Sequence, residues 1–149
     1  MKAVVQRVRN SKVSVNGNII SQINKGFNVL FCAQEGDTKT DADYLVKKIS
    51  NLRIFEDNEG KMNLSIKDIN GEMLIISQFT LAASTKKGNR PSFTKAMNPN
   101  DANELYEYFM NEIAKQNIPV KKGMFGEDML VEINNDGPVT ILFDTKNKE

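Results

Sequence analysis

A repeated alternation of apolar and polar residues constrains the fold of this chain more than any other feature of its sequence. Lys2 to Arg9 alternates in this way and is rich in residues that favour strands. Lys12 to Val15 and Asn18 to Ser21 flank the pair Asn16-Gly17, which is typical of the tight turn of a β-hairpin. The sequence therefore predicts antiparallel strands at the beginning of the chain.

Several later segments also have the length and composition of strands. They are Gly26 to Ala33, Arg53 to Phe55, Lys61 to Ile69, Met73 to Ile76 running into Ser77 to Leu81, Met129 to Ile133 and Val139 to Phe143. Turn-forming residues separate them, with Asp57 to Gly60 before the third segment and Asn134 to Pro138 before the last. We expect seven or more strands, joined mostly by short turns.

Two segments have the periodicity of an amphipathic helix. Apolar residues recur at helical spacing at Ala42, Leu45, Val46, Ile49 and Leu52, with Thr40 as the expected N-cap. Asn98-Pro99 supplies an N-cap and a first-turn proline for a second helix that extends to about Gln116. The buried face of this second helix is expected to consist of Ala102, Leu105, Phe109 and Ile113.

These elements predict a single α+β domain over residues 1–149, with largely antiparallel sheets and two main helices packed on one side. A chain of 149 residues buries about 70% of its unfolded surface, so it needs no disulfide or metal for a stable core. Residues 145–149 are expected to form a frayed tail.

Composition excludes several classes of protein and of catalytic site. No apolar run approaches the roughly 20 residues of a membrane span, and the first residues lack the apolar stretch of a secretory signal. Cys32 is the only cysteine, which favours a reducing, cytoplasmic location. The chain has no histidine, so it has no Ser-His-Asp triad and no histidine-ligated metal. We therefore expect neither a metal nor another cofactor.

Ser77-Gln78-Phe79-Thr80 is the first candidate for a functional segment. It places two hydroxyl groups, a carboxamide and an aromatic ring where a buried strand ends. An aromatic face can stack on a base while amide and hydroxyl groups bind its edge or the ribose, as occurs at unpaired RNA ends. An ordinary polar strand end explains the same residues, because no histidine is present to activate either hydroxyl as a nucleophile.

Gly137-Pro138 is the second candidate, within the turn cluster that runs from Asn135 to Thr140. A β-turn between two strands explains this cluster. A Gly-Pro pair also permits a cis peptide bond and unusual backbone angles, and so allows rigidly aimed carbonyl groups that can accept hydrogen bonds from an ammonium group.

Two loops complete the set of candidates. Gly123 to Met129 places two glycines around Phe125 and methionines, which suits either a pocket wall or core packing. Lys86 to Phe93 is a basic loop that either contacts phosphates or is simply solvated. The net charge of +1 neither supports nor excludes RNA binding.

Together these blocks closely resemble the D-aminoacyl-tRNA deacylases of the D-Tyr-tRNA deacylase type. The resemblance spans nearly the whole chain. It rests on Met1 to Val8, Ser77 to Leu81, Gly88 to Phe93 and Asn135 to Thr140 in this order. Glu127 departs from the small residue expected at its position.

The resemblance implies a homodimer with composite active sites and aminoacyl-tRNA as the substrate. Ser77, Gln78, Phe79 and Thr80 would line the site for the 3'-terminal adenosine and the D-aminoacyl ester, while Phe125 and Met129 would enclose the base. Gly137-Pro138, in the cis form and steadied by Arg7, would enter the site of the partner subunit and reject L-amino acids. Gly-tRNA mischarged on tRNA(Ala) would be a second substrate, because glycine has no side chain to exclude.

Two chemical routes remain open for this activity. In one, the neighbouring ribose hydroxyl assists water while backbone donors around Phe79 and Thr80 stabilise the oxyanion. In the other, the Thr80 hydroxyl is the nucleophile. Three other functions also remain: a deacylase with relaxed chirality and a trans Gly-Pro bond, a non-catalytic nucleic-acid binder of the same fold, and a structural dimeric domain.

Overall fold

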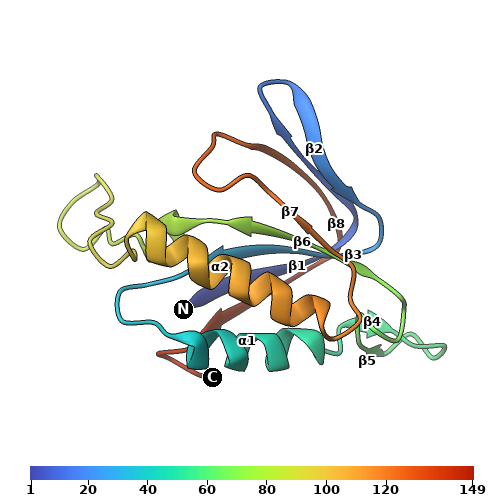
Figure 1. The fold of residues 1–149 in the computed structure, drawn as a ribbon. Helices are drawn as coiled ribbons and strands as arrows, with labels where there is room; N and C mark the ends of the chain where they lie inside the picture. The colour runs from blue at the N-terminus through green and yellow to red at the C-terminus, as the bar shows by residue number, and fades with distance from the viewer.

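The computed structural model describes residues 1–149, which form eight strands, two α-helices and one short 3-10 helix (Figure 1). The strands are β1 (Lys2–Val15), β2 (Asn18–Ile23), β3 (Gly26–Cys32), β4 (Phe55–Glu56), β5 (Met62–Leu64), β6 (Glu72–Ser77), β7 (Val120–Lys122) and β8 (Leu130–Asp144). The helices are α1 (Lys39–Ser50), η1 (Phe79–Ala82) and α2 (Pro99–Ala114). The expected α+β class with two main helices is confirmed.

One six-stranded sheet organises the fold. Its order is β2-β1-β3-β6-β7, and β8 pairs with β1 along almost the whole length of that strand. β1 is antiparallel to β2, β3 and β8, whereas β6 is parallel to both β3 and β7. The sheet is therefore mixed. The segment with α1 connects β3 to β6 and the segment with α2 connects β6 to β7, and parallel strands require crossover connections of this kind.

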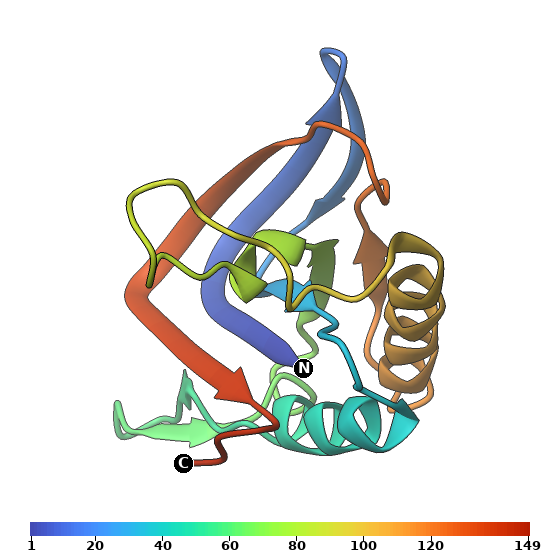
Figure 2. The same cartoon turned by 90° about the vertical axis from the view of Figure 1, so that its left-hand side faces the viewer.

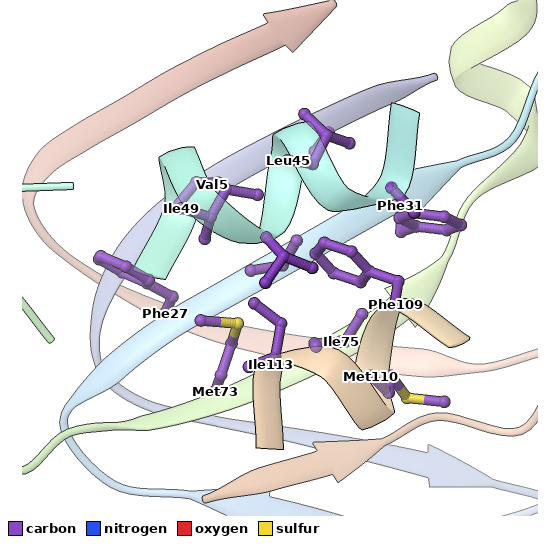
Figure 3. Close-up of a cluster of buried hydrophobic side chains, with 14 of the residues drawn as sticks. Val5, Phe27, Phe31, Leu45, Ile49, Met73, Ile75, Phe109, Met110 and Ile113 are labelled. Atoms are coloured by element: carbon purple, nitrogen blue, oxygen red, sulfur yellow. The ribbon is translucent and has the colours of Figure 1, made fainter. Parts of the chain in front are cut away.

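Both helices cover the same face of the sheet (Figure 1) and enclose the main core with it (Figure 3). The core side chains that Figure 3 labels are Val5, Phe27, Phe31, Leu45, Ile49, Met73, Ile75, Phe109, Met110 and Ile113. Phe31 stacks on Phe109 with a centroid separation of 4.9 Å, which joins β3 to α2. β6 pairs with β3 on one side and with β7 on the other, so its carboxyl end lies at one edge of this core.

Both helices begin with a side-chain cap, but the first cap is not the expected residue. Asn98 caps α2 and Pro99 follows it, as predicted. For α1 the N-cap is Thr38 rather than Thr40, and Thr38 forms a capping box with Asp41. The Asp41 carboxylate accepts a hydrogen bond from the backbone N–H of Thr38 at 2.9 Å, and this reciprocal contact makes Thr38 the better cap.

Two other expectations also differ from the structure. The strand predicted over residues 61–69 is limited to β5, which pairs only with β4 in a separate two-stranded sheet. The tail is not free at its beginning, since the backbone N–H of Thr145 donates to the carbonyl oxygen of Met1 at 2.9 Å.

Neither α1 nor α2 has the length and apolar character needed to cross a bilayer.

Candidate active site

The carboxyl end of β6 carries the first group of candidate residues. β6 is buried from Met73 to Ile76, and the strand ends at the half-buried Ser77. The backbone N–H of Gln78 donates to the carbonyl oxygen of Phe31 at 2.7 Å, after which the chain turns into η1. Phe79 and Thr80 are both exposed in η1, so their position on an edge of the sheet makes them accessible to a substrate.

The side chains of this segment are held by one another and by a neighbouring loop. The Gln78 amide nitrogen donates to the Thr80 hydroxyl oxygen. Phe79 is 56% exposed, and the ring of Phe93 lies edge-on against its ring with a centroid separation of 5.2 Å. An exposed aromatic face with an amide and hydroxyls beside it can hold a nucleobase and a ribose.

Cys32 lies directly behind η1, and the sequence did not single it out as a neighbour of this site. Its Sγ contacts the carbonyl oxygen of Phe79 at 3.7 Å and that of Ala33 at 3.6 Å. Burial raises the pKa of the Cys32 thiol, which therefore stays protonated at neutral pH. A buried, protonated thiol can support the backbone of η1 but cannot act as a nucleophile.

The loop from Gly123 to Met129 packs beside the end of β6. The N–H of Gly123 donates to the carbonyl oxygen of Ile75 at 3.3 Å, and the N–H of Met124 donates to Sδ of Met129 at 3.4 Å. A Cβ on Gly123 would lie 2.8 Å from that sulfur and 3.2 Å from Cδ1 of Ile76. Glycine at this position therefore brings Met129 close to β6.

Tyr106 of α2 joins this loop to the same strand. Its hydroxyl donates to the carbonyl oxygen of Ile75 at 2.6 Å, and its ring lies 6.0 Å from the ring of Phe125, centroid to centroid. Phe125 and Met129 are thus both half-buried in the region where β6 ends. Tyr106 was missed in the sequence, and Phe93 was included only as part of the basic segment, because helical and loop patterns do not indicate which residues they contact.

Gly137 and Pro138 form the second group of candidate residues, in the middle of β8. The sequence predicted a turn between two strands, but β8 is one strand that pairs with β1 on both sides of this point. Gln6 pairs with Thr140 and Val8 pairs with Asn135, so four residues of β8, Asp136 to Val139, lie opposite Arg7 alone. These four residues form a bulge, which projects from the ladder.

The bulge is clamped from behind by the buried side chain of Arg7. Nε of Arg7 donates to the carbonyl oxygen of Asp136 at 2.9 Å, and Nη1 donates to that of Ile54 at 2.6 Å. Gly137 has φ +129°, the Gly137-Pro138 peptide bond is cis, and both residues are exposed. Arg7 thus holds the bulge by the carbonyl group of Asp136, the residue before this exposed pair.

A single chain does not bring the two groups together. In the ladder Ser77 is level with Phe31, and Phe31 is level with Ala3, four residues before Arg7 on β1. At about 3.3 Å per residue, Ser77 and the bulge opposite Arg7 are about 13 Å apart along the strands. At about 4.8 Å per spacing, the three spacings from β6 through β3 and β1 to β8 add about 14 Å across the sheet. Figure 2 shows the bend of β8 at the left edge of the molecule and η1 near its centre.

Comparison with known proteins assigns a family to this arrangement. The family model described as "D-Tyr-tRNA(Tyr) deacylase" matches residues 4–144, nearly the whole chain. The chain belongs to this family. The recognition made from the four sequence blocks is therefore confirmed, and so is the assignment of the chain as a hydrolase of the D-aminoacyl-tRNA deacylase type.

Relatives in this family are similar over their full lengths. A "D-aminoacyl-tRNA deacylase" of Thermosipho melanesiensis is 54% identical over 147 residues, which is 98% of either chain. One of Natranaerobius thermophilus is 54% identical over 149 residues, 99% of either chain. The deacylase family thus covers the strands and loops that carry both groups of candidate residues.

Two solved structures resemble the fold. The "c-Myc DNA Unwinding Element Binding Protein" superposes with a TM-score of 0.91 at 43% identity, covering 97% of this chain and 99% of its own. A "probable eukaryotic D-amino acid tRNA deacylase" superposes with a TM-score of 0.78, covering 95% of this chain and 97% of its own. At 17% identity the second likeness concerns the fold alone.

Proposed function

We propose that this deacylase removes D-amino acids from tRNA, accepts Gly-tRNA mischarged on tRNA(Ala), and rejects L-aminoacyl-tRNA. The observation that carries the proposal is the exposed Gly137-Pro138 bulge, held from behind by the buried guanidinium of Arg7. Arg7 anchors the residue before Gly137, which supports a bulge held in one position for contact with a ligand. We place the reaction in the cytoplasm, where aminoacyl-tRNA is used.

The substrate's 3'-terminal adenosine would bind at the end of β6. The exposed ring of Phe79 offers a stacking surface, while Ser77 and Gln78 offer hydrogen bonds to the ribose and the ester. Phe125 and Met129, which pack beside β6, would enclose the base. The aminoacyl ester would then lie over the beginning of η1.

The active site would be completed by a second copy of the chain. Gly137 and Pro138 are exposed, and within one chain they lie about three strands from Ser77. A homodimer that places the bulge of one subunit over η1 of the other brings both groups together. Each of the two sites would then contain residues from both subunits.

Chiral selection would act by exclusion. The fixed carbonyl oxygens of Gly137 and Pro138 would accept hydrogen bonds from the substrate's α-ammonium group. With this group held, an L side chain would point into the protein wall and a D side chain into open space. Glycine has no side chain and would therefore escape the selection.

Hydrolysis itself would depend on position rather than on an acidic or basic side chain. The chain has no histidine, and the hydrogen bond that the Thr80 hydroxyl makes in the structure comes from the Gln78 amide, which cannot act as a base. Water would attack the ester carbonyl with help from the neighbouring ribose hydroxyl, and the backbone N–H of Phe79 would stabilise the oxyanion. The ester C–O bond then breaks, the ribose oxygen takes up a proton, and a free amino acid is released.

Side-by-side hydrolysis of D-Tyr-tRNA, L-Tyr-tRNA and Gly-tRNA at limiting enzyme tests this function. We expect rapid loss of D-tyrosine and glycine with L-Tyr-tRNA left intact. Equal rates on the D and L esters would contradict chiral selection and favour a deacylase with relaxed chirality. Dimer formation is tested separately by sedimentation, and a monomer that is fully active would contradict the composite site.

One observation supports a second candidate function. The structural relative with a TM-score of 0.91 is named for binding a DNA unwinding element. A nucleic-acid binder of this fold would retain affinity for single-stranded DNA and leave the aminoacyl ester uncut. Binding of a single-stranded DNA probe without hydrolysis of any of the three esters would favour this candidate.

A further inference from the structure

The segment between η1 and α2, residues 83–97, is called the basic loop here. Its four charged residues are Lys86, Lys87, Arg90 and Lys95, and no acidic residue occurs between Glu72 and Asp101. Because the whole chain has a net charge of +1, the residues outside the basic loop carry three more acidic than basic side chains. Positive charge is therefore concentrated in this one loop.

The basic loop surrounds a polar hollow of about 310 Å³. All four basic side chains line the hollow together with three hydroxyl side chains, and no apolar side chain lines it. None of the four basic residues forms an ion pair with an acidic group. Like charges that converge without a counter-charge repel one another, which favours binding of an anion among them.

Hydrogen bonds give the basic loop a defined shape. Ser84 and Ser92 exchange two backbone hydrogen bonds, at 2.8 and 2.9 Å, which close the loop on itself. At its other end the carbonyl oxygen of Lys95 accepts from Glu35 N–H at 2.9 Å, and Met97 N–H donates to the carbonyl oxygen of Ala33 at 3.2 Å. The hollow therefore lies in a segment fastened to the end of β3.

The hollow is also next to the candidate active site. Phe93 belongs to the basic loop, and its ring packs edge-on against Phe79 of η1 with 5.2 Å between centroids. In both views the loop runs from η1 to α2 and projects from the fold beside η1 (Figures 1 and 2). Ser92 and Thr94, the neighbours of Phe93 in the chain, line the hollow, so a ligand stacked on Phe79 would lie beside it.

We propose that this hollow binds the phosphodiester backbone of the RNA immediately upstream of its 3'-terminal nucleotide. The proposal rests on the proposed function for the identity of the ligand. Proteins that hold single-stranded nucleic acid combine an aromatic platform for bases with a basic groove for the backbone, and Phe79 and the hollow provide these two parts. Contacts to phosphate position the nucleic acid and carry no sequence information. The hollow thus strengthens the binding of any tRNA, whatever its amino acid.

Two substrates separate this role from the chemistry. D-Tyr-tRNA has upstream phosphates, whereas the D-tyrosyl ester of adenosine has none. In the triple variant Lys86→Gln, Lys87→Gln and Arg90→Gln, we expect kcat/KM on D-Tyr-tRNA to fall about tenfold or more at roughly 150 mM salt. Hydrolysis of the adenosine ester should remain within about twofold, because that substrate does not reach the hollow. The salt dependence of tRNA binding should weaken by about 0.7 in log-log slope for each phosphate that the variant no longer neutralises.

The matched control removes the same charge elsewhere. Lys61→Gln, Lys67→Gln and Lys115→Gln together neutralise three exposed lysines outside the basic loop, and this variant should retain activity on both substrates. The proposal is overturned if the basic-loop variant loses kcat/KM equally on both substrates, or on neither. It is also overturned if the control variant loses as much activity on D-Tyr-tRNA as the basic-loop variant does.

Failure of the proposed function is recognised separately. The wild-type chain would then hydrolyse neither ester, and affinity for deacylated tRNA, measured by fluorescence anisotropy, would still test the hollow. Weaker binding only in the basic-loop variant supports the proposal, and unchanged binding overturns it. A loss that persists with tRNA lacking its last three nucleotides also overturns it, because the hollow would then contact the body of the tRNA.

Discussion

Nε of Arg7 donates a hydrogen bond to the carbonyl oxygen of Asp136, the residue before Gly137, at 2.9 Å. Through Nη1 the same guanidinium holds the carbonyl oxygen of Ile54, and the Arg7 side chain is almost completely buried. One side chain thus ties the β8 bulge to the segment before β4. Lysine cannot satisfy both acceptors in this geometry, because it lacks the planar fork of donors.

We expect Arg7→Lys to lower the free energy of unfolding by about 1–3 kcal/mol, since a buried carbonyl group loses its donor. Freed from its clamp, the Gly137 bulge should also discriminate less, so L-Tyr-tRNA hydrolysis should rise relative to D-Tyr-tRNA. Urea denaturation and the two hydrolysis rates measure these effects. Arg9→Lys is the control, because the Arg9 side chain is 77% exposed and its pair with Asp136 is worth little. Unchanged selectivity in Arg7→Lys would contradict the clamp.

Gly137→Ala tests the bulge itself. A Cβ at this position would lie 2.9 Å from Cγ2 of Val139 and 3.1 Å from Nη2 of Arg7, and φ of +129° is unfavourable for alanine. We expect a loss of about 1–3 kcal/mol in stability together with altered D/L selectivity. Gly60→Ala is the matched control, since Gly60 has φ +74° with no atom within 4 Å of a Cβ, and it should leave selectivity unchanged. Equal D/L ratios in both variants would argue against a selective role for Gly137.

The sequence predicted local elements well where one pattern determined them. Asn98-Pro99 marked the start of α2, because capping and the first-turn proline depend only on neighbouring residues. The parallel pairing of β6 with β3 was not predicted, since it depends on α1 packing over the sheet rather than on any turn. The β8 bulge was interpreted as a turn between two strands, because residues such as Asn, Asp, Gly and Pro favour turns as well as bulges.

The candidate site shows the same division. Ser77 to Thr80 are adjacent in sequence, so their proximity needed no tertiary information. The contact of Phe93 with Phe79 and that of Tyr106 with the β6 backbone join segments distant in sequence, and no periodicity encodes them. The separation of Gly137 from Ser77 within one chain follows from strand order, which the sequence does not specify.

Thr80→Val distinguishes the two chemical routes. Valine keeps the volume of threonine and removes the hydroxyl, which in the structure accepts a hydrogen bond from the Gln78 amide. Because an amide that donates to this hydroxyl cannot deprotonate it, we expect the single-turnover rate on D-Tyr-tRNA to stay within about threefold of the wild-type rate. Thr40→Val, at an exposed position of α1, is a control for the substitution itself. A rate loss of roughly a thousandfold or more in Thr80→Val alone would establish Thr80 as the nucleophile.

Cys32 offers a second test of side-chain chemistry. This residue is 1% exposed, and burial raises the pKa of its thiol, so the reactive thiolate is scarce at neutral pH. We expect a thiol reagent such as iodoacetamide to label the folded protein far more slowly than the urea-unfolded chain. Cys32→Ala should retain hydrolysis of D-Tyr-tRNA at close to the wild-type rate. Abolished hydrolysis in a variant that remains folded would contradict this expectation and show that the site needs the thiol, either in the reaction or as support for η1.

Tyr106 predicts how stability changes at alkaline pH. Burial raises the pKa of Tyr106 above the value of 10.0 that applies to the unfolded chain. Above about pH 10 the unfolded chain therefore loses this proton while the folded chain keeps it, so the free energy of unfolding falls as pH rises. Below about pH 10 both states are protonated and the contribution is constant. Urea denaturation between about pH 8 and 11 should show this decline.

The variant Tyr106→Phe removes the titrating group together with its hydrogen bond to Ile75. We expect it to be about 1 kcal/mol less stable than the wild type at about pH 8 and to lose less stability between about pH 10 and 11. Cys32→Ala measured in parallel isolates the thiol, whose raised pKa gives a decline of the same sign from about pH 9. If Tyr106→Phe and the wild type lose the same stability in this alkaline range, the Tyr106 hydroxyl is not held in its neutral form by the fold.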